Sequence, residues 1–446
     1  MKKTEKNSSA GLIACGALTV VLIILLTVMA YLLNSRGNTV KFDLASVTYG
    51  EASDDIDVTK VFVPEFAGIS AGGKTGGTSV SPNVAAEIFR FVSPVIADML
   101  SSAECTDGSA ADWERMLGGE TYIYLRYHTE LPECVLGVMA AAYSGAEYSF
   151  SSNDSCVYET IVIPGADSSG VTEMALRSRD GEVKLYKSAT SLTRDSTVKT
   201  LESYSRNLTR FTLTSTEPVF TEGIFTRSIS VMKNAASVYD GTADDTADSI
   251  MRFFGMNPEK LLSTHSADGV KSYTDTHGML TVTSSSIKYE TTSEGGVGVG
   301  ELAGRSAQGD IGDYIKASCA ILSRLTSISK YILGGDADVC LGSVDSEDGV
   351  VTLGFMYVFD NIPIKCAEPA LNIVFENGIL RSVSVYTLFV RNLGERRELI
   401  SESWFTDYLG KINAEYDSVT VVYAPDDASE SENQVKAVWG YFTTRH

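Results

Sequence analysis

The sequence ALNIVFENGILRSVSVYTLFV, residues 370–390, decides the fold class of this chain. Apolar or alternating runs flank Asn377-Gly378 on both sides. Alternation with a period of two indicates a half-buried strand. The Asn-Gly pair tolerates the positive φ angles of a type I′ turn, which matches the twist of paired strands. The stretch therefore predicts an antiparallel hairpin.

Three further two-residue signals predict hairpins elsewhere in the chain. They are Asp180-Gly181, Asp268-Gly269 and Asp348-Gly349. Each pair suits a tight turn for the same reason, and each is flanked by apolar or alternating residues. Antiparallel pairing is therefore expected along much of the chain after Tyr122.

Two segments repeat one plan, a helix followed by strands. The first is residues 243–291 and the second is residues 309–391, and the glycine-rich residues 293–310 between them are expected to form a linker. The second helix has apolar residues at spacings of three and four, a core-facing pattern that ends at Gly334-Gly335. These residues are Ile311, Ile315, Cys319, Leu322, Leu325, Ile328 and Ile332. Helices packed on antiparallel sheets predict an α+β fold.

The region before Tyr122 shows a different pattern. Residues 38–66 alternate like strands, as at Val61 and Val63, and the Gly/Ser/Thr-rich residues 68–81 are expected to form a loop. A helix is predicted to begin at Pro82 and to kink at Pro94.

The N-terminus carries a run that predicts a membrane helix. Residues 11–33 contain no charged residue, and about 20 apolar residues suffice to cross a bilayer. Lys2, Lys3 and Lys6 precede the run, which places the N-terminus in the cytoplasm. A cleaved signal peptide would have a shorter core and a cleavage site, and a buried soluble helix rarely has an unbroken apolar surface.

This organisation predicts five segments. They are a cytoplasmic N-terminus (1–10), a transmembrane helix (11–33), an N-terminal α+β ectodomain (34–235), a helix-plus-hairpin unit (236–300) and a second α+β unit (309–446).

Charge and cysteine content limit the partners and the chemistry. The chain carries a net charge of −21, and residues 1–33 hold three lysines and one glutamate, so residues 34–446 carry −23. Such an acidic domain is repelled by nucleic acid and by anionic lipid, so no nucleic-acid partner is expected. Six cysteines lie outside the membrane helix, mostly among apolar residues, which favours core thiols over disulfides. They are Cys105, Cys134, Cys156, Cys319, Cys340 and Cys366.

Short motifs suggest enzymatic sites but lack the context that each requires. Residues 68–75 match the phosphate-loop pattern and residues 68–72 match the nucleophile elbow, yet Gly76-Gly77 follows where both mechanisms need a helix. The SxxK of residues 196–199 and the SxN of residues 205–207 are too close together for a penicillin-recognising enzyme. In that class the KTG motif comes last in the chain, but here Lys74-Thr75-Gly76 comes first.

Cofactor and metal signals are equally weak. Residues 298–303 fit a relaxed dinucleotide fingerprint, but no strand leads into them. The four histidines, His128, His265, His277 and His446, form no HxxxH or HExxH pair. No catalytic, cofactor-binding or metal-binding residue is therefore predicted, and the chain is not expected to be an enzyme.

Small residues in the cytoplasmic half of the membrane helix are the predicted partner contact. Ala10, Ala14 and Ala17 would let another helix approach closely. The alternative is an ordinary anchor facing lipid, because small residues are common in membrane helices.

Several stretches, taken in order, resemble the YycH/YycI type of two-component-system regulators from Gram-positive bacteria. A short basic N-terminus and one membrane helix precede an α+β exterior with the following segments in order. They are 113–117 (WERML), 122–127 (YIYLRY), Leu131-Pro132, the hairpin unit 268–289, 354–364 (GFMYVFDNIPI) and 370–379 (ALNIVFENGI).

The resemblance implies a non-enzymatic regulator. Such proteins act on a membrane sensor histidine kinase that controls cell-wall metabolism, largely through their membrane helices, and a companion protein of similar build takes part. The two C-terminal units would then resemble PepSY-type modules. The alternative function is an extracytoplasmic cell-wall hydrolase or ligand receptor, which would require a cleft that gathers Ser70 or another nucleophile with a histidine and a carboxylate.

Overall fold

The computed structural model describes most of the chain after residue 56. The described residues are 57–146, 155–166, 170–214, 217–233, 243–260, 262–266, 269–291, 296–304, 309–329, 332–412, 414, 418–424 and 433–442. Contacts divide the chain into Met1–Glu51 and Ala52–His446, and every described residue belongs to the second unit. The predicted membrane helix (11–33) and its contact residues Ala10, Ala14 and Ala17 lie outside the described residues. Within the described part, no helix has both the length and the apolar composition to cross a membrane.

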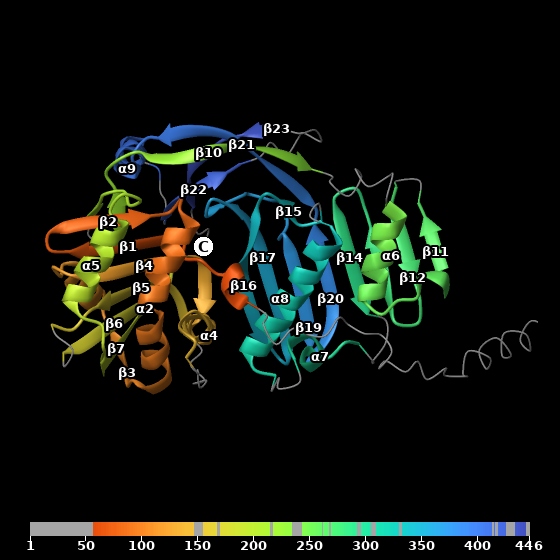
Figure 1. Cartoon of the computed structure of the whole chain (residues 1–446), viewed down its shortest axis with the longest axis horizontal. Coiled ribbons are helices and arrows are strands. Elements are labelled where there is room, and N and C mark those ends of the chain that lie inside the picture. The colour runs from red at the N-terminus through yellow and green to blue at the C-terminus, as the bar shows by residue number, and fades with distance from the viewer. Residues whose placement is uncertain are drawn as a thin grey trace, which may run out of the picture. The chain divides into compact units, whose positions relative to one another are not determined.

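A seven-stranded antiparallel sheet forms the N-terminal part of the described fold (Figure 1). The strand order is β2-β1-β4-β5-β6-β7-β3. The bounds are β1 (Phe66–Ala71), β2 (Lys74–Thr78), β3 (Cys105–Gly108), β4 (Tyr122–Pro132), β5 (Cys156–Ile163), β6 (Val171–Arg177) and β7 (Val183–Ala189).

Both faces of this sheet are covered. The helices α2 (Pro82–Ser102) and α4 (Glu133–Ser144), together with the 3-10 helix η2 (Val58–Val61), cover one face. The helix α5 (Arg194–Tyr204) packs on this same face, where Leu201 lies against Gly76 of β2. The other face contacts α3 (Ala110–Leu117) and the hairpin of β8 (Phe211–Leu213) and β9 (Pro218–Phe220). Because both faces are buried, residues 122–127 of β4 are apolar or aromatic except at Arg126, instead of alternating with polar residues.

A second, nine-stranded sheet forms most of the C-terminal part. Its path is β11-β12-β13-β14-β20-β19-β17-β16, and β18 pairs with β17. The bounds are β11 (Leu262–His265), β12 (Lys271–Thr274), β13 (Gly278–Val282), β14 (Ser286–Thr291), β16 (Asp338–Glu347), β17 (Val350–Phe359), β18 (Ile362–Pro363), β19 (Leu371–Glu376) and β20 (Ile379–Tyr386).

Three helices accompany the second sheet: α6 (Ala243–Phe253), α7 (Val299–Ala303) and α8 (Ile311–Ile328). In Figure 1, α6 and α8 lie in front of its strands. Phe254, just after α6, stacks on Tyr289 of β14 with ring centroids 4.1 Å apart. Tyr314 of α8 packs edge-on against Phe375 of β19 at 5.2 Å. Aromatic contacts therefore attach both helices to the sheet.

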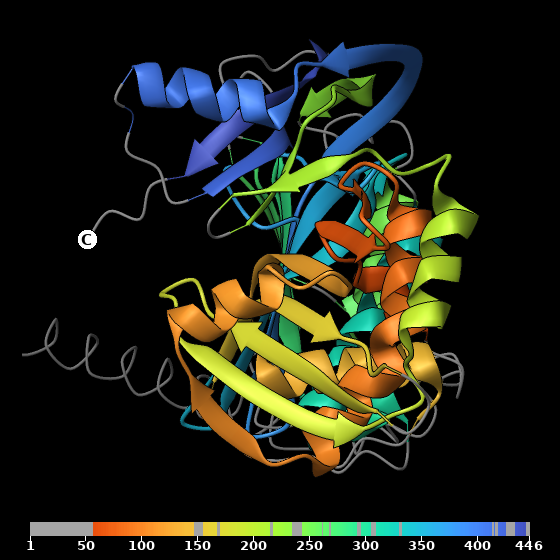
Figure 2. The same ribbon diagram turned by 90° about the vertical axis from the view of Figure 1, so that its left-hand side faces the viewer.

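Two smaller sheets and a helix complete the described fold. One sheet has the order β15-β21-β10-β23 and the other pairs β22 with β24. The helix α9 (Glu402–Lys411) runs beside β22 and β24 (Figure 2). The strand bounds are β10 (Ile224–Lys233), β15 (Gly334–Gly335), β21 (Leu388–Leu399), β22 (Ser418–Tyr423), β23 (Asn433–Val435) and β24 (Ala437–Phe442).

The described hairpin turns follow the predicted signals. Asn377 and Gly378 have φ angles of 51° and 78° between β19 and β20, and Asp348 and Gly349 have 49° and 79° between β16 and β17. Gly181 has a φ of 87° between β6 and β7. The turn residue Gly269, between β11 and β12, has a φ of 77°, whereas Asp268 lies outside the described residues. The α+β class with helices on antiparallel sheets is thus confirmed.

Several local predictions were wrong, and packing explains why. The expected loop at 68–81 contains the tight hairpin of β1 and β2, because the small residues Gly68 and Gly77 let Phe66 and Phe211 pack against the backbone. Val61 ends a 3-10 helix instead of lying in a strand. The expected linker contains α7, which packs on α8, and Val299 N–H donates to the Gly378 carbonyl at 2.8 Å. The helix α8 ends at Ile328, and Gly334-Gly335 instead forms the short strand β15, which pairs with β21.

The two predicted C-terminal units share one sheet. The strand β14 of the first unit pairs with β20 of the second, with Lys288 opposite Ser384. In addition, β10, from the segment predicted as the N-terminal ectodomain, pairs with β21 and β23. The division into domains at 235, 300 and 309 stays a prediction.

Candidate functional site

A group of buried charged side chains lies where three parts of the fold meet, and we call it the charged junction. It comprises Glu65, Arg126, Glu159, Arg177, Glu217 and Glu402. Its centre is Arg126 on β4, whose side chain is only 4% exposed. Arg126 Nη2 lies 3.4 Å from Glu65 Oε1, and Nη1 lies 3.2 Å from Glu217 Oε2. One guanidinium therefore binds two carboxylates from distant parts of the chain.

A second ion pair lies beside Arg126 on the same sheet. Arg177 of β6 pairs with Glu159 of β5, and the Tyr124 hydroxyl also donates to Glu159. The Arg177 guanidinium lies over the Trp113 ring of α3, 4.4 Å from its centroid. The adjacent strands β4, β5 and β6 thus place Arg126, Glu159 and Arg177 side by side under the layer formed by α3 and the β8–β9 hairpin.

Two contacts connect the charged junction to the C-terminal part of the chain. Glu402, in the first turn of α9, accepts a hydrogen bond of 3.0 Å from the Phe220 N–H of β9. The Thr420 hydroxyl of β22 donates to Glu65. The charged junction therefore links the first sheet to α9 and to the β22–β24 pair.

The charged junction holds more acids than bases. Four carboxyl groups accompany two guanidinium groups, and all but Glu217 and Arg177 are almost fully buried. Removal from water disfavours a charged carboxylate, so proton binding becomes easier. Burial raises the pKa of Glu402 to about 7, and the attraction of Arg126 opposes that rise. Burial also raises the pKa of Glu217. Neither Glu402 nor Glu217 is therefore an ordinary surface carboxylate.

A neutral contact joins the first sheet to the second sheet. Asn361, in the turn between β17 and β18, is 2% exposed and has a positive φ of 65°. Its Nδ2 donates to the carbonyls of Pro64 (2.8 Å) and Glu65 (3.2 Å), and its Oδ1 lies 3.2 Å from His128 Nε2 on β4. Burial lowers the pKa of His128, which favours the neutral ring. This contact holds the β17–β18 turn against β1 and β4.

The structure does not bring the motif residues together as an enzyme would need. Ser70 pairs with Tyr122 at the start of β4, and His128 lies six residues farther along that strand. At about 3.3 Å per residue the separation is roughly 20 Å. Lys74 is exposed at the β1–β2 turn, so no helix follows the glycine-rich motif. Residues 196–199 lie on α5, and residues 299–303 form α7.

Histidines and other metal-ligand residues are dispersed. His265 is exposed on β11, His277 lies in the turn between β12 and β13, and His446 is outside the described residues. In the described ranges, no three His, Cys, Asp or Glu side chains gather as a metal site. The six cysteines after the predicted membrane helix are thiols in the structure, two of them buried.

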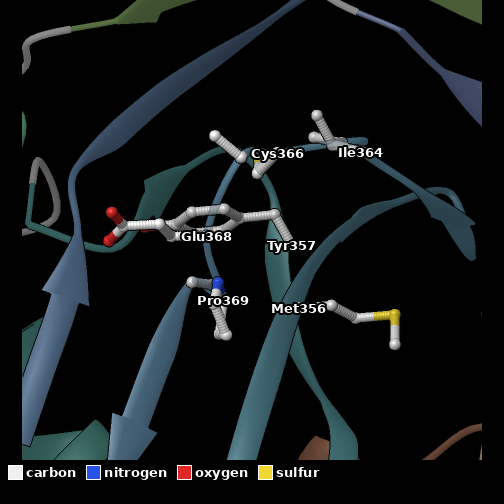
Figure 3. Close-up of a pocket in the computed structure, with 8 residues that line it drawn as sticks. Met356, Tyr357, Ile364, Cys366, Glu368 and Pro369 are labelled. Carbon is white, nitrogen blue, oxygen red and sulfur yellow. The ribbon is translucent and has the colours of Figure 1, made fainter.

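A small pocket opens beside β17 and the segment that follows β18 (Figure 3). Its volume is about 270 Å³, just below the range usual for small-molecule sites. Its lining is Met356, Tyr357, Ile364, Cys366, Ala367, Glu368, Pro369 and Ala370. This set contains one carboxylate and one thiol but no histidine, so the pocket does not hold the catalytic arrangement that a hydrolase would need.

The helix α9 also exposes apolar side chains. Trp404 and Tyr408, one helical turn apart, stack at 5.8 Å and are 55% and 44% exposed. On the neighbouring face of the helix, Phe405 stacks on Trp439 of β24 at 6.2 Å, and Leu409 is buried. One face of α9 therefore holds the helix on the protein, while the other presents aromatic rings to solvent.

Sequence reasoning missed the charged junction. The available signal was a charge inside an apolar strand, since Arg126 interrupts the run of residues 122–127. A buried arginine needs carboxylate partners, but nothing local identifies them. Glu217 is 91 residues from Arg126, and Glu402 is 182 residues from Phe220.

The fold and the site define an α+β protein in which a buried network of charges connects the first antiparallel sheet to α9 and to the β22–β24 pair. Among solved structures, the chain is similar to YycH from Bacillus subtilis, with a TM-score of 0.53 and 14% identity. The match covers 86% of this chain and 94% of YycH. The chain therefore has a YycH-like fold, which confirms the resemblance to that type at the level of the fold.

One other solved structure is less similar to this chain. An uncharacterized protein from Eubacterium rectale ATCC 33656 matches with a TM-score of 0.35 and 12% identity over 48% of this chain and 76% of its own. That score does not establish a common fold. No protein-family model and no curated protein matches the sequence.

Proposed function

We propose that this chain is a membrane-anchored, extracytoplasmic regulatory protein that modulates a sensor histidine kinase by protein–protein contact. The observation that carries the proposal is the YycH-like fold over 86% of the chain. The same type of regulator is implied by the order of sequence segments and by the charge-free run at residues 11–33. The proposed process is cell-wall metabolism in a Gram-positive bacterium.

The proposed topology is a single pass with the N-terminus in the cytoplasm and residues 34–446 outside. Lys2, Lys3 and Lys6 support this orientation through the preference of positive charge for the cytoplasmic side. The partners are the kinase and a companion of the YycH/YycI type. The PepSY-like character of the C-terminal units stays a prediction.

We place the kinase contact on the small residues Ala10, Ala14 and Ala17. Helices in lipid associate without a hydrophobic driving force, so close approach at small residues supplies much of the energy. Replacing Ala14 and Ala17 with leucine adds bulk but keeps the segment apolar, so insertion should survive. Association should weaken by about 1 kcal/mol or more, the scale of single contacts in membranes.

The test has two arms. In native membranes, a photocrosslinker at position 14 should capture a histidine kinase, and the Ala14→Leu/Ala17→Leu variant should alter expression of a cell-wall regulon. The matched control is Ala30→Leu, which adds the same bulk at the far end of the run and should leave expression unchanged. If an exported chain lacking residues 1–33 restores normal regulation in full, the helix is only an anchor.

A further inference from the structure

One buried carboxyl group contributes to the attachment of α9 to β9. Glu402 is 2% exposed, and its Oε2 accepts the Phe220 N–H of β9 at 3.0 Å. Among the described residues, Glu402 forms no ion pair with an arginine, lysine or histidine. Its charge, when present, therefore lacks a dedicated counter-ion.

The surrounding groups do not supply one. Arg126 faces Glu402 from β4, but its two Nη atoms already contact Glu65 and Glu217. Glu65, from the segment before β1, and Glu217, from the turn before β9, also face Glu402 and repel a negative charge there. Glu159 and Arg177, from β5 and β6, neutralise each other beside Glu217. A third carboxylate beside one shared guanidinium is unfavourable in a site with so little water.

We propose that proton binding at the Glu402 carboxyl controls the attachment of α9: the protonated group holds the helix on β9, and ionisation loosens it. The inference rests on the geometry of the charged junction and does not depend on the identity of any kinase partner. The response would make α9 sensitive to the pH of the compartment that contains it.

The direction of the pH response follows from linkage. Burial raises the pKa of Glu402 to about 7 when α9 is attached, against an ordinary value of 4.5 when the helix is released. Between pH 4.5 and about 7, the attached state therefore binds more protons at Glu402 than the released state does. The equilibrium constant for attachment of α9 is largest below pH 4.5. It falls by up to tenfold per pH unit as the pH rises towards about 7, and it is constant above that pH.

Loosening α9 would change the surface of the protein. The helix presents Trp404 and Tyr408 to solvent, and its inner face covers Trp439 through Phe405. Release would uncover that inner face together with the Phe220 N–H. Proton binding would thus regulate which apolar surface the C-terminal part displays.

The experiment is amide hydrogen exchange of the full chain in detergent between pH 5 and pH 8, with each rate divided by the chemical exchange rate at that pH. In the parent, protection of the α9 amides should fall by on the order of tenfold or more over this range relative to α2. Glu402→Gln keeps an acceptor for Phe220 but cannot ionise, so its protection should be independent of pH and should exceed that of the parent at pH 8. The matched control, Asp407→Asn, removes an exposed carboxylate from the same helix and should behave like the parent.

A pH-independent protection of α9 in the parent would overturn the proposal, as would a Glu402→Gln variant that keeps the parent's response. Infrared difference spectra provide a second measurement that does not need this variant to fold. The parent and Asp407→Asn should both lose the carbonyl band of a buried protonated carboxyl as pH rises from 6 to 8. If no such band is lost, Glu402 does not bind the proton.

Discussion

Arg126 shows how a single residue can determine a junction between elements. It interrupts an apolar strand and binds two carboxylates at 3.4 and 3.2 Å with a side chain that is 4% exposed. Buried pairs of this kind add little over an apolar core, but removing one partner leaves an uncompensated charge. The energetic importance of Arg126 therefore lies in the acids that it neutralises.

Arg126→Met should destabilise the fold by about 3–5 kcal/mol because Glu65 and Glu217 lose their counter-ion. Denaturant unfolding followed by circular dichroism measures this change. The control is Arg115→Met, since Arg115 is 53% exposed and pairs with Glu173 at the surface. Arg115→Met should lower the free energy of unfolding by no more than about 1 kcal/mol. Equal losses in both variants would show that the buried pair has no special role.

Asn361 allows a second test at the residue scale. Asn361→Gly keeps the positive φ but leaves the Pro64 and Glu65 carbonyls without their donor, which should cost about 1–3 kcal/mol. Asn377→Gly makes the same change at a φ of 51° in an exposed turn, so its effect should be within about 0.5 kcal/mol. Thermal unfolding of both variants compares them directly, and similar melting temperatures would contradict the bridging role of Asn361.

At the scale of elements, helices are attached to the second sheet by ring contacts. Phe254 stacks on Tyr289 of β14 with an interplanar angle of 5°, and both residues are 3% exposed. Phe254→Ala should therefore cost about 3–5 kcal/mol. Because β14 pairs with β20, hydrogen exchange should accelerate in both strands. Phe253→Ala, at the half-buried neighbouring position, should cost less, and an equal cost would contradict the stacking argument.

At the scale of the whole molecule, the orientation in the membrane is the main prediction. A cysteine-free chain carrying either Glu5→Cys or Asp240→Cys should react with a membrane-impermeant thiol reagent only at position 240. The reason is the positive charge of Lys2, Lys3 and Lys6 on the cytoplasmic side of the apolar run. Permeabilised cells should react at both positions, which controls for reagent access. Labelling of intact cells at position 5 alone would reverse the orientation.

The antiparallel hairpins and the α+β class could be read from the sequence because their causes are local. Alternating residues around Asn377-Gly378 define two strands and their turn within 21 residues. The same reasoning failed at Lys74 and at residues 299–303, where glycine-rich composition suggested loops. There, packing against distant aromatic and helical elements determines the structure, and no local pattern encodes it.

By itself, the sequence determined the hairpin turns, the core-facing helix before Gly334 and the acidic charge of residues 34–446. Only the tertiary structure decided that β14 and β20 join two predicted units in one sheet, and that Glu402 accepts a hydrogen bond from the Phe220 N–H of β9. The physical reason is separation along the chain: Arg126 and Glu217 are 91 residues apart, and Glu65 and Thr420 are 355 apart. Strand pairing and the pKa of a buried carboxyl depend on which distant groups meet and on how much water they lose, and folding alone decides both.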